Sequence, residues 1–252
     1  MPKFFVDDNQ IYENNIEVIN DDVKHIKKVL RKNIGDTIEV CNRNTGDNFL
    51  CKITEFKDGK IICNIDKIIE NKAENNIYIN IFQGLPKLDK MEYIIQKSVE
   101  LGVSEITPLN MKRCVVKIDI KDESKKIQRW NKISEVAAKQ CGRNIIPKVN
   151  SVAKIKEIGD LCNDYDIILV AYEGEKNNKL KKVLKELKSI YNTDKILKTA
   201  IVIGPEGGID KEEVEELNKI DNTKIITLGD RILRTETVAL NMTSIIMYEF
   251  EG

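Results

Sequence analysis

Two loops rich in glycine and charged side chains carry the residues that could do chemistry. The first is GPEGG at 204–208 and the second lies within LGDRILRTETVAL at 228–240. Glycine lets a backbone approach a ligand closely or adopt a positive φ. A guanidinium can stabilise an anion and a carboxylate can accept a proton, which are the groups of Arg234 and Glu236. We therefore expect a reactive ligand site, although GPEGG alone would also suit an ordinary strand–turn–helix connection.

Each loop directly follows a short apolar segment rich in β-branched residues, ending at Ile203 and Thr227. Such segments are typical of buried strands in a parallel sheet. The loops then lie at the carboxyl ends of strands, where open α/β sheets bind ligands. The sequence has no G-x-x-x-x-G-K-[ST] and no G-x-G-x-x-G motif. This excludes a triphosphate or a dinucleotide pyrophosphate bound in the usual way.

Length and composition are those of a globular chain. The 252 residues allow one large domain or two smaller ones, and 41% are hydrophobic and 33% charged. No stretch approaches the ~20 apolar residues that span a bilayer, and the N-terminus lacks the apolar core of a signal peptide. The six cysteines form no C-x-x-C pair and have no nearby histidine. We expect a cytoplasmic protein with reduced thiols, no metal site and no membrane contact.

Charge is balanced over the whole chain but clustered locally. With 41 basic and 41 acidic residues, the chain is not a general polyanion binder. The segment 112–143, however, contains ten basic and four acidic residues, and 25–32 contains five basic residues and no acid. Either cluster could follow a phosphate backbone or could simply be a solvated helix face. His25, the one histidine, is either structural or a nucleic-acid contact.

The pattern of apolar residues changes near residue 77. Residues 1–70 alternate short strand-like runs with turns, which predicts a small antiparallel barrel or sandwich. Residues 70–76 are polar and are a plausible linker. From 77 onwards strands alternate with helices, which predicts an α/β domain with a mostly parallel sheet.

The last predicted helix, 237–249, is apolar over most of its circumference. A helix of this kind must be covered on nearly all sides. Either a subunit interface or burial within the fold would provide the cover. We expect Met242 and Tyr248 to lie in such an interface.

Taken together, GPEGG and LGDRILRTETVAL resemble the signature of the RsmE-type 16S rRNA uridine-N3 methyltransferases. This family belongs to the knotted SPOUT class of S-adenosylmethionine enzymes. The resemblance covers nearly the whole chain and is weakest over 150–200. Further segments resemble the family in the same order: HIKKVLRKNIGD at 25–36, KMEYIIQKSVELGVSEITPL at 90–109, RCVVK at 113–117 and QCGRNIIPKV at 140–149.

The resemblance implies a PUA-like RNA-binding β-barrel over 1–70 and a SPOUT α/β-knot methyltransferase domain over 77–252. It also implies a C-terminal segment threaded through a loop, one of the rare exceptions to unknotted topology. In the family this knot packs against a twofold-related copy, so a homodimer is expected.

The implied activity is S-adenosylmethionine-dependent methylation of N3 of a specific uridine in 16S rRNA of the small ribosomal subunit. The Gly-rich turns would grip the cofactor largely through backbone groups, and apolar residues would sandwich its adenine. The residues assigned to the cofactor are Gly204, Glu206, Gly207 and Gly208 on one wall, Leu228, Gly229, Ile232 and Leu233 on the adenine side, and Thr235 as a polar contact.

Transfer to uridine N3 requires loss of the N3 proton. Arg234 is expected to stabilise the resulting anion beside its oxygens. Glu236 is expected to take the proton, unless it only forms a salt bridge to Arg231 or Arg234. Glu206 is the alternative base.

The target base must leave the RNA stack to reach the pocket, while basic residues hold the surrounding backbone. Arg31, Arg113 and Arg143 are the residues expected to do so. Two other functions stay open: a non-catalytic RNA-binding protein, and a related knotted methyltransferase acting on tRNA or on a ribose 2′-hydroxyl.

Overall fold

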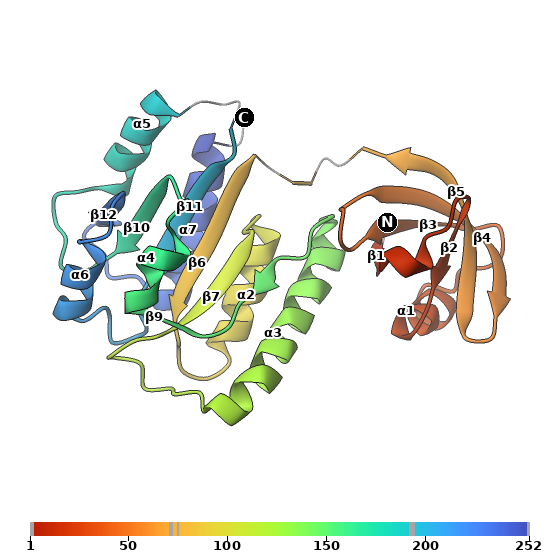
Figure 1. The fold of residues 1–252 in the computed structure, drawn as a ribbon, viewed down its shortest axis with the longest axis horizontal. Coiled ribbons are helices and arrows are strands. Elements are labelled where there is room, and N and C mark those ends of the chain that lie inside the picture. Colours follow the sequence, from red (N-terminus) through yellow and green to blue (C-terminus); the bar gives the residue numbers. More distant parts are fainter. Residues whose placement is uncertain (1–2, 71–72, 75, 192–194, 251–252) are drawn as a thin grey trace. The chain divides into compact units, whose positions relative to one another are not determined.

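The computed structural model describes residues 3–70, 73–74, 76–191 and 195–250 (Figure 1). The chain divides into two compact units, residues 1–74 with 138–146 and residues 75–137 with 147–252. Residues 138–146 belong to the first unit, although the predicted domain ranges 1–70 and 77–252 would place them in the second. Those ranges stay a prediction of where independent domains begin and end.

The first unit is built on a five-stranded mixed sheet with the order β1-β3-β4-β5-β2. Its strands are β1 (Lys3–Val6), β2 (Asn15–Val18), β3 (Thr37–Asn42), β4 (Asn48–Lys57) and β5 (Lys60–Ile69). Asp58 and Gly59 join β4 to β5 with φ of 43° and 78°, as a two-residue hairpin turn requires. The prediction of a purely antiparallel sheet was wrong for β1, which pairs with β3 in parallel. The long connection through β2 permits this, because parallel neighbours need a crossover.

The core of this unit comes from alternate strand residues and one helix. Phe4, Ile16, Ile38 and Ile61 are essentially inaccessible to solvent. Ile26 joins them from a helical segment formed by α1 (Asp21–Lys24) and a π-helical turn (His25–Val29). Exposed His25 of this turn lies edge-on to the ring of Phe4, with centroids 5.8 Å apart. The short η1 (Asp8–Gln10) precedes β2.

The second unit is built on a parallel sheet of seven strands. The order is β12-β10-β11-β6-β7-β8, and β9 also pairs with β7. The strands are β6 (Ile77–Gly84), β7 (Glu105–Asn110), β8 (Lys148–Val149), β9 (Ala153–Lys154), β10 (Ile167–Ala171), β11 (Leu197–Ile203) and β12 (Thr223–Ile226). Central strands β6 and β11 are buried on both faces, which explains their continuous apolar runs. The predicted α/β class with a mostly parallel sheet is confirmed.

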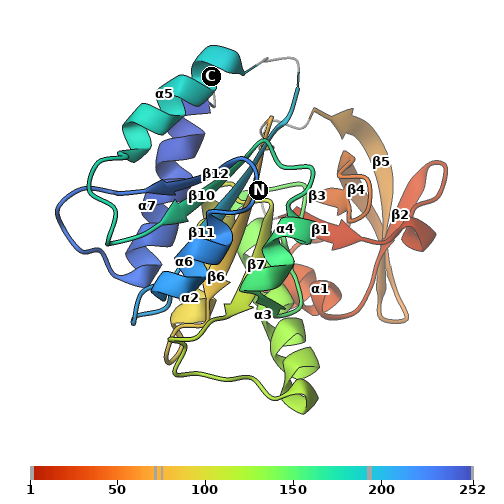
Figure 2. The same ribbon diagram turned by 60° about the vertical axis from the view of Figure 1, so that its left-hand side comes forward.

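Helices cover both faces of this sheet. They are α2 (Lys90–Glu100), α3 (Ile120–Cys141), α4 (Ile158–Leu161) after the turn η3 (Ile155–Glu157), α5 (Leu180–Ile190), α6 (Lys211–Leu217) and α7 (Thr235–Phe250). Figures 1 and 2 show α2 and α7 on one face, with α4 and α6 on the other. No helix within the described ranges has the length and apolarity to cross a membrane.

The C-terminal helix α7 packs against α2, β6 and β11. Its buried face includes Ala239, Met242 and Ile246, whereas Ile245 is 37% and Tyr248 86% exposed. The expectation that Met242 lies at a subunit interface was therefore wrong, because the fold of the chain already buries it. Tyr248 stays at the surface, where a partner could cover it.

Candidate active site

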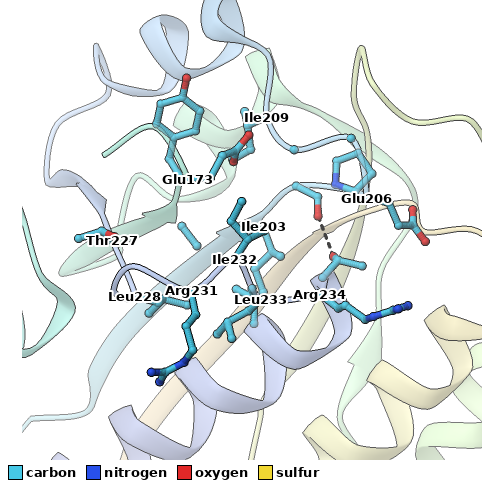
Figure 3. Close-up of a pocket in the computed structure, with 18 of the residues that line it drawn as sticks. Glu173, Ile203, Glu206, Ile209, Thr227, Leu228, Arg231, Ile232, Leu233 and Arg234 are labelled. Carbon is cyan, nitrogen blue, oxygen red and sulfur yellow. Dashed lines mark hydrogen bonds between the residues drawn. The ribbon is translucent and has the colours of Figure 1, made fainter. Parts of the chain in front are cut away.

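A pocket of about 480 Å³ opens at the carboxyl edge of the parallel sheet (Figure 3). Three loops form it: the segment after β10, the GPEGG turn after β11, and the segment 227–235 that leads from β12 into α7. Lys90 at the start of α2 and Val238 of α7 complete the lining. The three strands are hydrogen-bonded neighbours, so their loops meet at one edge. This is where the sequence placed the ligand.

The GPEGG turn is tight for identifiable reasons. The amide of Gly208 donates to the carbonyl of Pro205 at 2.9 Å, and Gly208 has a φ of +72°. A Cβ on Gly208 would lie 2.2 Å from the carboxylate of Glu173, and one on Gly204 would lie 2.8 Å from the backbone of Gly208. Gly207 has no positive φ, so the special conformation belongs to Gly208.

The turn leads directly into α6. The Asp210 side chain accepts from the amide of Glu212 at 3.2 Å, and Glu213 reaches back to the amide of Asp210 at 3.3 Å. This capping box satisfies donors at the helix N-terminus and fixes the exit of the loop.

The segment 227–235 supplies the apolar side of the pocket. Gly229 has a φ of +111°, and its amide donates to the hydroxyl of Thr227 at 3.2 Å. Leu228 and Leu233 are partly buried, whereas Ile232 is 88% exposed. An exposed isoleucine beside a pocket is an available apolar surface for a flat ligand.

Thr235 ties this segment to the GPEGG turn. Its hydroxyl donates to the carbonyl of Gly204 at 2.7 Å and accepts from the side-chain amide of Gln83 at 2.8 Å. Thr235 is buried and lines the pocket. Because two protein groups already engage the hydroxyl, its geometry favours a structural tie over a donor to a ligand.

The opposite side of the pocket is charged. The ammonium of Lys90 lies 3.0 Å from Glu206 Oε1 and 3.3 Å from Glu236 Oε2. Glu236 thus pairs with Lys90, rather than with Arg231 or Arg234 as the sequence alternative had it. The guanidinium of Arg234 is exposed and points toward the same side in Figure 3.

These contacts shift the pKa values of Glu206 and Lys90 in opposite directions. Burial alone would raise the pKa of Glu206, but hydrogen bonds from its own amide, from Lys90 and from the amide of Lys87 lower it below its ordinary value. The hydrogen bond to Glu206 is also the main reason that the pKa of Lys90 is raised. Both groups are therefore charged near neutral pH.

Several pocket residues escaped the sequence reasoning, and Glu173 and Lys90 are two charged examples. Glu173, labelled in Figure 3, follows β10. Its carboxylate lies close to Gly208. Lys90 comes from a helix over a hundred residues before the GPEGG turn. The run IILVAYE could have indicated Glu173, since it too is a strand followed by a charged residue at the same sheet edge. Nothing in the sequence indicates that Lys90 meets two glutamates.

The three arginines expected to bind RNA have different surroundings. The Arg113 guanidinium donates to the carbonyl of Gly207 at 3.1 Å and pairs with Asp210 at 3.2 Å, so it braces the GPEGG turn. Arg143 is buried and forms a 2.7 Å ion pair with Glu74, an arrangement that ties 138–146 into the first unit and does not favour RNA contact. Arg31 is exposed, with a φ of 51°. Their RNA-binding role stays a prediction.

Fold and site together define an α/β domain with a ligand pocket at the carboxyl edge of its parallel sheet, in a chain with a second, smaller β unit. Residues 73–247 match the family described as an RNA methyltransferase domain, and residues 18–66 match an RNA methyltransferase PUA domain. The chain belongs to this RNA methyltransferase family, and its relatives carry the name ribosomal RNA small subunit methyltransferase E.

Individual relatives match over almost the whole length. The protein of that name from Bacillus subtilis is 37% identical over 93% of this chain and 90% of its own. The one from Mesomycoplasma hyopneumoniae is 34% identical over 95% of this chain and 96% of its own. A crystal structure of the Neisseria gonorrhoeae protein bound to S-adenosylmethionine superposes with a TM-score of 0.83, at 25% identity over 98% of this chain and 97% of that one.

Proposed function

We propose that this chain methylates N3 of a specific uridine in the 16S rRNA of the small ribosomal subunit, with S-adenosylmethionine as the methyl donor. One observation carries the proposal. A pocket formed by glycine turns and apolar side chains is lined also by Arg234 and Lys90, and Lys90 pairs with Glu236, which does not itself line the pocket. The relatives' names and the S-adenosylmethionine-bound relative support the substrate class and the cofactor.

The pocket fits the cofactor in size and chemistry. Its volume of about 480 Å³ lies in the range of small-molecule sites. Leu228, Ile232 and Leu233 offer apolar surface for an adenine, and the backbone at Gly208 and Gly229 adopts conformations that favour glycine. Bound there, S-adenosylmethionine supplies an electrophilic methyl group on a sulfonium.

The protein must make uridine N3 nucleophilic and hold it in line with that methyl group. The Arg234 guanidinium stabilises the uridine anion through charge-assisted hydrogen bonds to its oxygens. Of the two carboxylates, we assign Glu236 as the proton acceptor. Glu206 has a lowered pKa and already accepts from the amide of Lys87 at 3.0 Å, so it is a weak base with its oxygens occupied.

The remaining parts of the chain hold the RNA. The first unit matches a PUA domain and exposes basic residues along 24–32, with Arg31 among them. Their positive charge suits the backbone around a splayed nucleotide. The exposed stripe of α7, with Ile245 and Tyr248, is the surface for a second copy of the chain.

The decisive experiment separates cofactor binding from transfer and from product identity. Calorimetry measures S-adenosylmethionine binding, and small ribosomal subunits from a strain lacking the gene are then incubated with tritiated cofactor. Digestion to nucleosides should give N3-methyluridine as the labelled product. A 2′-O-methylated nucleoside, or label in tRNA alone, would refute the substrate. Absence of both binding and transfer would leave a non-catalytic RNA-binding protein.

A further inference from the structure

Lys90 occupies a position to which the mechanism above gives no role. It is the first residue of α2, whereas Glu206 belongs to the turn after β11 and Glu236 to the first turn of α7. Its ammonium lies at 3.0 Å from one carboxylate and 3.3 Å from the other. The side chains of Lys90, Glu206 and Glu236 are only 23%, 27% and 18% exposed. One cation therefore joins three elements around the rim of the pocket.

The two glutamates depend on this cation to different degrees. Glu206 also accepts hydrogen bonds from the amide of Lys87, at 3.0 Å to Oε1 and 3.3 Å to Oε2. Oε2 of Glu236 is buried and makes no hydrogen bond within the described part of the chain. The Lys90 ammonium, 3.3 Å away, is the counter-charge to that oxygen.

Removal of the cation would place two like charges in one partly desolvated site. Like charges at short range disfavour each other, and a buried carboxylate without a partner is strongly destabilising. Glu206 would keep the Lys87 amide. Glu236 would lose its counter-charge at Oε2, so its side chain would no longer be held in this orientation.

We propose that Lys90 is a positioning residue that holds the Glu236 carboxylate in a fixed orientation beside the pocket, with Glu206 as the anchor that holds the ammonium in place. This inference rests on the proposed function, since it concerns the orientation of the side chain that is proposed as the proton acceptor. Lys90 itself acts through Glu236 and not on the substrate. The arrangement also explains why a lysine stands at the start of α2, where the helix dipole disfavours a cation.

A set of variants tests the charge and the asymmetry. Lys90→Met removes the cation at similar length, and Lys90→Arg retains it. The doubles Lys90→Met/Glu236→Gln and Lys90→Met/Glu206→Gln each remove one carboxylate charge as well. Lys97→Met is the matched control, because Lys97 lies two turns along the same helix and pairs with Glu100 at 2.8 Å. Thermal unfolding, calorimetric S-adenosylmethionine binding and single-turnover methyl transfer are measured on each.

We expect Lys90→Met to fold and to bind the cofactor within about fivefold of wild type, while transfer falls by about 10²-fold, as for loss of acid–base catalysis. Lys90→Arg should recover most of the rate, and Lys97→Met should leave it unchanged. The Glu236→Gln double should regain thermal stability but not transfer, and the Glu206→Gln double should regain less stability, since Glu236 stays unpaired.

Three results would overturn the inference: wild-type transfer in Lys90→Met, equal loss in Lys90→Arg, or equal recovery of stability in the two doubles. The expected order of thermal stability of the two double variants can be measured whether or not the protein is catalytically active. If wild-type protein itself fails to methylate RNA, the proposed function fails while the ranking still reports on the Lys90 contacts.

Discussion

The hydroxyl of Thr235, the first residue of α7, donates a 2.7 Å hydrogen bond to the carbonyl of Gly204 at the end of β11 (Figure 3). Gln83 of β6 donates to the same hydroxyl at 2.8 Å. A single side chain thus joins two of the three pocket loops to the central strand β6. The two loops are adjacent in space although 31 residues separate the bonded groups.

Thr235→Val should loosen this joint with little change of shape. The variant leaves a buried carbonyl without its donor, which costs about 1–3 kcal/mol. S-adenosylmethionine affinity should fall with stability, because the two pocket loops that this hydrogen bond joins are released. Thr235→Ser keeps the hydroxyl and should stay close to wild type in urea unfolding and calorimetry. Equal behaviour of the two variants would mean that the hydrogen bond does not organise the pocket.

Gly208 should tolerate substitution less than Gly207. An alanine at 208 must adopt a φ of +72°, which strains any residue with a Cβ, and the Glu173 carboxylate, 2.2 Å from that Cβ, must also move aside. At 207 a Cβ would meet the Cβ of Arg113 at 3.1 Å, which a small shift relieves. We expect Gly208→Ala to weaken cofactor binding by tenfold or more, at a strain of ~1–3 kcal/mol, and Gly207→Ala by much less. Calorimetry on the folded variants decides, and a reversed order would contradict the loop geometry.

The sequence was sufficient to place the glycine turns at the carboxyl edge of a parallel sheet. Apolar runs before Gly204 and Leu228 identify the strands, and strand direction puts their loops together. It could not show that Lys90 faces Glu206 and Glu236, because that contact depends on how α2 packs beside α7. Nor could it show that Arg143 is buried against Glu74, since charge alone does not distinguish a surface cation from a paired one.

Buried thiols should make the protein sensitive to alkali. Burial raises the pKa of Cys51 and of Cys63, adjacent in the core of the first unit, to about 12. These thiols ionise less readily in the folded protein than in the unfolded chain. They therefore stabilise the fold fully below the ordinary thiol pKa, and this contribution is lost as pH rises from about 8.5 toward 12. The unfolding free energy should therefore fall by up to about 1.4 kcal/mol per pH unit for each such thiol in that window.

Urea unfolding at pH 8, 9 and 10 measures that slope, and Cys51→Val supplies the comparison. The variant removes one thiol that ionises on unfolding, so its stability should fall less steeply with pH. Val is close to Cys in size, and the site is fully buried. A slope equal to that of wild type would show that this thiol does not contribute to alkaline unfolding.

The fold, like the site, could be predicted from the sequence only in part. Alternating and helical patterns of apolar residues identify strands and helices, and Asp58-Gly59 identifies the β4–β5 hairpin. The parallel pairing of β1 with β3 was missed, because a short apolar strand carries no signal for the direction of its neighbour. The apolar circumference of 237–249 correctly indicated a helix that needs cover. It did not separate Met242, covered by this chain, from Tyr248, exposed on it. The threading implied by the resemblance stays a prediction.

Tyr248 and Met242 should therefore respond differently to a charge. If a second copy covers α7, Tyr248→Asp buries an unpaired charge in that interface at about 3–5 kcal/mol and gives folded monomers. Met242→Asp places the charge in the core of the subunit and should unfold it. Leu161→Asp, at a half-exposed apolar residue of α4 on the other face of the sheet, is the control and should remain dimeric. Sedimentation velocity with circular dichroism distinguishes these states, and a monomeric wild type would refute the dimer.

The proposed role of Arg234 can be tested against Arg231, a nearby arginine of the same pocket. Arg231 and Arg234 both line the pocket and are exposed, but Figure 3 shows their side chains directed to opposite sides of it. Only Arg234 points toward the side that holds Glu206. We expect Arg234→Ala to bind S-adenosylmethionine normally and to lose about 10²–10³-fold in single-turnover methyl transfer, the loss typical of removing one donor to a developing anion. Arg231→Ala should transfer at nearly the wild-type rate.

Arg234→Lys refines this test, because it separates charge from geometry. A lysine keeps the positive charge but lacks the planar fork that can donate to the anion from two nitrogens, so partial activity is expected. Stabilisation of the uridine anion implies a further signature. Raising the pH deprotonates the uridine without help, so the deficit of Arg234→Ala relative to wild type should shrink as pH increases. A deficit that is constant with pH, together with normal cofactor affinity, would assign Arg234 to RNA positioning and remove it from the stabilisation of the anion.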